Sequence, residues 1–148
     1  MEPVRQAMLS DVDAVAEMFN QYRVWYGKEA DPEGAKKFLS ERISKDESVI
    51  FISVHGDVMT GFTQLYPVFS SMRMKRSWVL NDLFVKEEFR GRGFSKALLE
   101  RAKDLCRETG AGGFTLETSK TNDVGNRLYP AAGMKLITDF NFYTWNVQ

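Results

Sequence analysis

The sequence is poor in cysteine and histidine, with one residue of each kind among 148. A single cysteine excludes an intrachain disulfide framework. Cys106 shares a predicted helical face with Leu98 and Leu105, so we expect it to be buried rather than reactive. The one histidine, His55, precedes Gly-Asp in a predicted tight turn, where a histidine is typically solvated rather than catalytic. No metal site is expected.

The sequence also lacks an excess of charge and any long apolar run. Lys plus Arg number 20, and Asp plus Glu also number 20, so the charge favours neither nucleic acid nor an anionic membrane as a partner. No apolar run approaches the roughly 20 residues that span a bilayer. The first residues lack the basic and apolar regions of a secretion signal, and we expect a cytoplasmic protein.

The composition predicts one folded domain. Hydrophobic residues make up 43% of the chain and aromatic residues 13%, which is enough apolar material for a buried core. No repeat, low-complexity tract or linker divides the chain. We predict a single domain over residues 1–148.

Apolar residues at three- and four-residue steps predict helices over residues 12–26, 31–44, 95–109 and 122–132. Apolar and β-branched runs predict strands over residues 4–7, 48–53, 58–66, 78–85 and 112–119, with one or two more in 134–147. Pro67 is expected to end the third of these strands, and residues 68–76 form either a loop or an edge strand.

The stretch Arg90-Gly91-Arg92-Gly93-Phe94-Ser95 lies where the predicted strand 78–85 hands over to the predicted helix 95–109. Backbone N–H groups of a glycine turn and of a helix N-terminus converge on one point, which suits a phosphate group. The strand-turn-helix-strand order favours a parallel pair, which puts the turn at the carboxyl end of its strand, where ligands gather. By itself the stretch could also be a solvated loop. A Walker loop is excluded because no Gly-Lys-Ser or Gly-Lys-Thr follows, and the spacing is not G-x-G-x-x-G.

Two stretches together, LNDLFVKEEFRGRGFSKALLERA and LETSKTNDVGNRLYPAAGMK, resemble the GNAT acetyltransferase superfamily over nearly the whole chain. Arg90, Gly93 and Ser95 occupy the fixed positions of the family signature R/Q-x-x-G-x-G/A. The family's downstream asparagine, small residue, Leu-Tyr pair and glycine are matched by Asn122, Gly125, Leu128-Tyr129 and Gly133. The resemblance implies an α/β fold with a mixed, mostly antiparallel sheet, a splayed parallel pair and flanking helices.

The resemblance also implies acetyl-CoA as the co-substrate. Backbone groups of Leu83, Phe84 and Val85 would bond its pantetheine arm like an added strand, and Asn122 would contact the pantetheine or phosphate region. Its pyrophosphate would be held by the backbone amides of Arg90, Gly91, Arg92, Gly93, Phe94, Ser95 and Lys96. Tyr129 matches the family's tyrosine whose hydroxyl lies near the thioester sulfur and stabilises the departing thiolate; the alternative is a core aromatic residue.

Two positions depart from the family pattern. Ser95 replaces the last glycine of the signature, and serine still offers its N–H and suits the start of a helix. Pro130 directly follows Tyr129, and a proline within a short helix removes a hydrogen bond and can kink the backbone, which affects the direction of the tyrosine side chain.

No motif identifies the base that takes the amine's proton. Asp82 and Glu117 are the carboxylates closest in sequence to the cleft strands, and Asn81 stands where some polyamine-acetylating relatives carry a glutamate. We expect Asp82 to act in catalysis or amine binding, with a buried carboxylate held by backbone N–H groups as the alternative. Asn81 and Asp82 are expected on opposite faces of their strand unless a bulge intervenes.

The predicted function is transfer of the acetyl group of acetyl-CoA to a primary amine of a small molecule, an amino acid or a lysine side chain. Residues 61–85 are similar to small histone, polyamine and D-amino-acid acetylating members of the family. The side chains that could line the acceptor pocket are Gln64, Tyr66, Trp25 and Tyr26. The alternative is a catalytically silent acyl-CoA sensor that acts through a protein partner. The aromatic stretch FNFYTW near the end of the chain predicts an edge strand and with it a homodimer.

Overall fold

The computed structural model describes residues 3–148, which divide into two compact units. The first unit runs to Glu117 and contains a five-stranded sheet in the order β1-β2-β3-β4-β5. The strands are β1 Val4–Gln6, β2 Val49–His55, β3 Val58–Ser70, β4 Lys75–Val85 and β5 Phe114–Thr115. The first four strands pair antiparallel, and β5 pairs parallel with β4. The predicted mixed, mostly antiparallel sheet is therefore confirmed.

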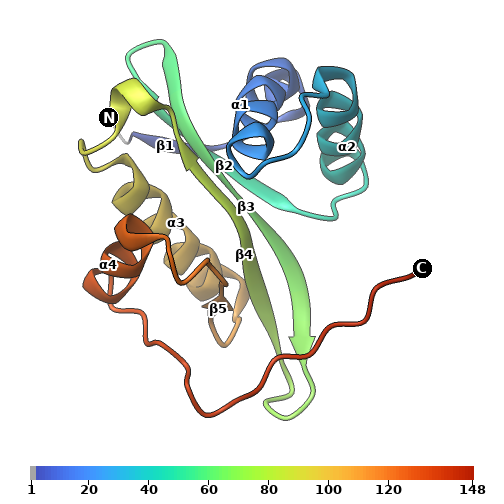
Figure 1. The fold of residues 1–148 in the computed structure, drawn as a ribbon, viewed down its shortest axis with the longest axis vertical. Coiled ribbons are helices and arrows are strands. Elements are labelled where there is room, and N and C mark those ends of the chain that lie inside the picture. Colours follow the sequence, from blue (N-terminus) through green and yellow to red (C-terminus); the bar gives the residue numbers. More distant parts are fainter. Residues whose placement is uncertain (1–2) are drawn as a thin grey trace. The chain divides into compact units, whose positions relative to one another are not determined.

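Helices cover both faces of this sheet, with α1 and α2 on one face and α3 on the other (Figure 1). Their bounds are α1 Val12–Trp25, α2 Pro32–Ser44 and α3 Phe94–Thr109. Local chemistry explains their ends: the Asp31 side chain caps α2 by accepting from the Gly34 N–H at 2.9 Å, and α3 ends at Gly110 with a φ of +65°. Short 3₁₀ turns, Leu9–Asp11 and Glu87–Phe89, precede α1 and the glycine turn.

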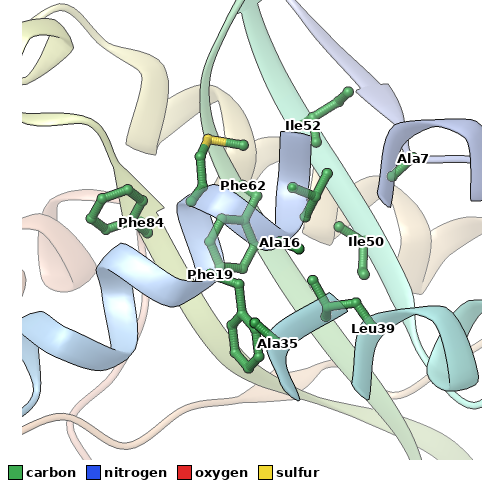
Figure 2. Packing of buried hydrophobic residues seen from close by; sticks show 11 residues of the cluster. Ala7, Ala16, Phe19, Ala35, Leu39, Ile50, Ile52, Phe62 and Phe84 are labelled. Atoms are coloured by element: carbon green, nitrogen blue, oxygen red, sulfur yellow. The ribbon is translucent and has the colours of Figure 1, made fainter. Parts of the chain in front are cut away.

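The face under α1 and α2 holds an apolar cluster (Figure 2). The Phe62 ring of β3 is 6.3 Å from the Phe19 ring of α1 and 6.2 Å from the Phe84 ring of β4, measured between centroids. Ile50 and Ile52 of β2 and Leu39 of α2 also belong to the cluster. Burying each such side chain stabilises the fold by about 1.5–3 kcal/mol. On the opposite face the Arg101 guanidinium of α3 lies over the Phe51 ring, 4.4 Å from its centroid. Cys106 is buried on α3, as predicted, and burial raises the pKa of its thiol.

A bulge in β4 changes which face its side chains cover. Gln64 pairs with Asp82 but Leu65 pairs with Leu80, so Asn81 is an extra residue on β4. Before the bulge Trp78 faces α3, where its Nε1 donates to the Thr109 hydroxyl at 3.0 Å. After it, Asp82 and Phe84 lie on the face covered by α1 and α2, because strand side chains alternate.

The second unit, Thr118–Gln148, contains helix α4, Asp123–Ala131. The predicted strands in residues 134–147 are wrong, since none of these residues is in a strand. Phe140, Phe142, Tyr143 and Trp145 are between 77% and 85% exposed. Aromatic and β-branched residues favour a strand only where a neighbouring strand offers its ladder, and no such pairing is found for them in the described chain.

Two further strand predictions differ from the structure. β3 continues through Pro67 to Ser70, because β2 pairs with β3 only as far as Leu65 and a proline is tolerated beside an open edge. The predicted strand 112–119 is reduced to the two residues of β5, which pair with Trp78 and Val79. No helix in residues 3–148 is both long and apolar enough to cross a bilayer.

Candidate active site

The glycine turn between β4 and α3 presents backbone N–H groups at the start of a helix. Gly91 and Gly93 have φ of +74° and +87°, a region in which a side chain is strained. In the part of the chain that the structure describes, no side chain caps α3, and its first backbone hydrogen bond runs from the Ala97 N–H to the Gly93 carbonyl at 3.0 Å. The N–H groups of Phe94, Ser95 and Lys96 precede this ladder. An anion fits this end of α3, where the helix dipole is positive.

The two arginines of the turn pack against the protein. Arg90 donates from Nε to the Val85 carbonyl at 3.0 Å, and its guanidinium lies over the Trp25 ring, 4.9 Å from the centroid. Arg92 lies over the Phe89 ring at 5.3 Å. These contacts tie the turn to the end of β4 and to the last residue of α1. The Arg90 side chain therefore holds the shape of the turn.

His55 lies beside the same turn, a position that the sequence did not predict. It is exposed, as expected, but its Nε2 is 3.4 Å from Nη2 of Arg92 and its ring centroid is 6.3 Å from that of Phe94. The β2–β3 hairpin thus contacts the glycine turn. No local pattern could have shown this, because 37 positions separate the two residues.

The carboxyl end of β4 has one open edge. Its parallel pairing with β5 stops at Val79, and residues 80–85 have no strand partner on that side within the described chain. The Lys86 N–H donates to the Thr60 carbonyl at 2.8 Å, so the alternating ladder turns the backbone groups of Phe84 toward β3 and those of Leu83 and Val85 toward the open edge. This edge can receive an extended chain that carries amide groups, and it leads directly into the glycine turn.

A row of three buried polar side chains crosses the sheet beneath α1 and α2. Ser48, Gln64 and Asp82 are 7%, 0% and 4% exposed. The Ser48 hydroxyl donates to Oε1 of Gln64 at 2.8 Å, and Nε2 of Gln64 donates to Oδ2 of Asp82 at 2.9 Å. The expected alternative for Asp82, a carboxylate held by backbone N–H groups, differs from this arrangement, since side-chain amides hold it. The bulge also lets Nδ2 of Asn81 reach Oδ1 of Asp82 at 3.2 Å.

Burial raises the pKa of Asp82 above the usual range of aspartate, and the hydrogen bonds from Gln64, Asn81 and Tyr22 oppose that rise. Burial together with the nearby charge of Asp82 raises the pKa of Tyr66 to about 12, so its phenol stays protonated at neutral pH. Tyr22 of α1 covers this region and donates to the Asn81 carbonyl at 3.4 Å. Glu117, the other candidate carboxylate, is exposed. The sequence singled out Asp82, while Ser48 came from outside the expected site.

Asn122 caps α4 in the second unit. Its Oδ1 accepts from the Gly125 N–H at 3.1 Å, and its Nδ2 donates to the Thr118 hydroxyl at 2.8 Å. A Cβ on Gly125 would clash with the Asn122 side chain and would also come within 3.1 Å of the Tyr129 ring, so glycine makes room above all for the capping asparagine. α4 continues through Pro130 and ends at Ala131, and the proline therefore falls in the last turn, where it removes one helical hydrogen bond.

The sequence profile of the Acetyltransferase (GNAT) family matches residues 13–134, and the chain belongs to this family. Members of the family are acetyltransferases that use acetyl-CoA as co-substrate.

Similar proteins agree with that assignment. The "Uncharacterized N-acetyltransferase YhfO" of Bacillus subtilis (strain 168) is 44% identical over 144 residues, with 97% of each chain covered. A "Probable acetyltransferase" of Haemophilus influenzae (strain ATCC 51907 / DSM 11121 / KW20 / Rd) is 34% identical over 100 residues, which cover 67% of this chain and 68% of that protein. The crystal structure of a probable acetyltransferase superposes with a TM-score of 0.92 at 38% identity and covers 98% of this chain and 97% of that one.

Proposed function

We propose that this acetyltransferase moves the acetyl group of acetyl-CoA to a primary amine by direct attack of the neutral amine. The observation that carries the proposal is the open edge at Leu83 and Val85, which runs straight into the uncapped N-terminus of α3. An arm containing amides fits such an edge, and a pyrophosphate fits such a helix start. Both features belong to the first unit.

We assign the amine's proton to Asp82. An alkylammonium has an ordinary pKa near 10.4, so it must lose a proton before it can attack. Asp82 is the buried carboxylate of the central strands, and a raised pKa makes it a better proton acceptor than an exposed aspartate. The aromatic rings of Tyr22 and Tyr66 beside it suit the apolar part of an amine, and an ammonium is also attracted to a ring face.

We assign to Tyr129 the role of proton donor to the departing thiolate, with Asn122 contacting the carrier's arm. The family match across residues 13–134 supports both assignments, because it spans the boundary between the two units. The same span supports the proposal that the two units work as one domain.

The proposed activity is tested by acetyl-CoA-dependent release of CoA against a panel of polyamines, amino acids and lysine peptides. We expect turnover with at least one amine and an N-acetylated product by mass spectrometry. Binding of acetyl-CoA without turnover of any amine would contradict the assignment and favour the sensor alternative.

Replacing Tyr129 by phenylalanine tests the proton donor. We expect kcat to fall about 100-fold while the Kd for acetyl-CoA changes by less than about twofold, since a general acid acts mainly in the transition state. Tyr143→Phe removes a hydroxyl from a tyrosine that is 85% exposed and serves as the control. Equal rates for the two variants would remove Tyr129 from the chemistry.

A further inference from the structure

Gln64 is an uncharged amide that is completely buried between two polar side chains. Its strand β3 lies between β2 and β4, so Ser48 reaches it from one side and Asp82 from the other. A buried amide must have its donors and acceptors satisfied. Here Oε1 accepts from a hydroxyl and Nε2 donates to a carboxylate, which uses both ends of the amide.

The orientation of the Gln64 amide depends on both neighbours. With Asp82 ionised, the reverse orientation would place Oε1 against a carboxylate oxygen, and two acceptors facing each other at 2.9 Å repel. The Ser48 hydroxyl stabilises the observed orientation because it donates to Oε1 at 2.8 Å. Since a hydroxyl can also accept, the row could satisfy a protonated Asp82 after the amide turned over.

We propose that Gln64, oriented by Ser48, is a positioning residue that keeps the buried Asp82 carboxylate ionised and aimed so that it can take the proton of the acceptor amine. In that step an N–H bond of the ammonium breaks, and an O–H bond forms on Asp82. The lone pair left on nitrogen attacks the acetyl carbonyl carbon, a C–N bond forms as the thioester C–S bond breaks, and the second proton that the nitrogen loses ends on the departing thiolate. The inference rests on the proposed function of Asp82 as the proton acceptor.

The other groups near Asp82 favour its ionised form less than Gln64 does. Tyr22 of α1 and Asn81 of β4 contribute hydrogen bonds without charge, and Tyr66 of β3 stays protonated at neutral pH. The charge of Arg42 on α2 acts to lower the pKa of Tyr66, and Arg42 forms ion pairs with Glu41 and Glu47 at 3.3 and 3.2 Å. The short bond from Gln64 is therefore the main contact that offsets the cost of burying the Asp82 charge.

Replacing Gln64 by methionine keeps its length and removes both hydrogen bonds. The Asp82 carboxylate then loses the hydrogen bond from Gln64 while it stays buried, so its pKa should rise by about one unit or more. Ser48→Ala leaves the Gln64 amide in place but frees it to turn over, so we expect a smaller rise in the Asp82 pKa. Thr60→Val is the matched control. It breaks a different fully buried hydrogen bond between β2 and β3, which joins the hydroxyls of Thr60 and Ser53 at 2.7 Å and does not involve Asp82.

The test measures the Asp82 pKa by carbon NMR titration of protein labelled at its aspartate carboxyl groups, with Asp82→Asn identifying the signal. It also measures kcat/KM against pH for the same variants. We expect the titration midpoint and the acidic limb of the kcat/KM profile to move upward together in Gln64→Met and to stay unchanged in Thr60→Val.

An unchanged midpoint in Gln64→Met, or an equal shift in Thr60→Val, would overturn the role of Gln64. A shifted midpoint with an unmoved acidic limb would leave Gln64 holding the carboxylate but exclude Asp82 as the proton acceptor, which separates this inference from the proposed function. If circular dichroism shows Gln64→Met to be unfolded, Ser48→Ala decides: a raised midpoint supports the proposal and an unchanged one overturns it.

Discussion

Asp11 accepts three hydrogen bonds at the junction of β1 and α1. Nη1 and Nη2 of Arg5 each donate to it at 2.9 Å, and the Met8 N–H donates at 2.8 Å. The bonds from Arg5 lower the pKa of the carboxyl, although its burial opposes them. Because the folded protein binds this proton more weakly than the unfolded chain does, the stabilisation is present above the ordinary aspartate pKa of about 3.9 and is lost as the pH falls through the lowered value.

Asp11→Asn should lower the free energy of unfolding by about 1–2 kcal/mol at pH 7, with the half-exposed Arg5 keeping the loss modest. Near pH 3 the difference from the unmodified protein should shrink. Urea unfolding of the variant and of the unmodified protein at pH 7 and pH 3 measures the difference in the free energy of unfolding. Asp13→Asn is the control, since its ion pair with Lys36 is exposed on both sides and should contribute close to nothing. A loss that does not depend on pH would contradict the charge-based explanation.

The end of α1 supports the glycine turn through one aromatic contact. Trp25 is the last residue of the helix and is 69% exposed, yet its ring lies under the Arg90 guanidinium that also bonds the end of β4. An exposed contact of this kind is worth about 0.5–1 kcal/mol. The helix that borders the proposed amine site is thereby connected to the turn proposed to hold the pyrophosphate.

Trp25→Ala should weaken the binding of CoA by about two- to fivefold, because Arg90 loses the contact that orders the turn. Isothermal titration with CoA measures the effect. Phe69→Ala removes a similarly exposed ring, 73% exposed and under Arg76, from the β3–β4 hairpin and should leave affinity unchanged. The coupling between α1 and the turn is refuted if both variants bind alike.

The second unit carries the exposed aromatic residues Phe140, Phe142, Tyr143 and Trp145. Within the described chain, no strand pairs with them. We propose that a second copy of the chain covers them, because a group of exposed apolar side chains marks a surface for association. The hairpin methionines Met72 and Met74 are 95% and 89% exposed but stand singly between polar residues, which is ordinary for a surface.

A chain that ends at Thr138 should be monomeric, whereas the full chain should be a dimer. Light scattering at tens of micromolar measures the two masses, because a modest interface associates at roughly this concentration. Met72→Ser is the control for exposed apolar surface elsewhere and should remain dimeric. A monomeric full chain under these conditions would remove the homodimer.

Local sequence predicted the elements that depend on neighbouring residues. The helices, the β2–β3 hairpin and the glycine turn were found at nearly their observed positions, because helical periodicity, turn residues and the positive φ of Gly91 and Gly93 act within a few residues. The strands expected in residues 134–147 and the end expected at Pro67 were wrong for the opposite reason. Whether such a segment is a strand depends on which strand lies beside it.

The same distinction holds for the site. The order of residues already identified a family of acetyltransferases and located the glycine turn before α3, since both depend on contiguous motifs. Only the tertiary structure brought Ser48, Gln64 and Asp82 into one row, because their contacts depend on the register of three strands and on the bulge at Asn81 that turns Asp82 to the face beneath α1 and α2. A one-residue change of register would have placed that carboxylate on the other face of the sheet.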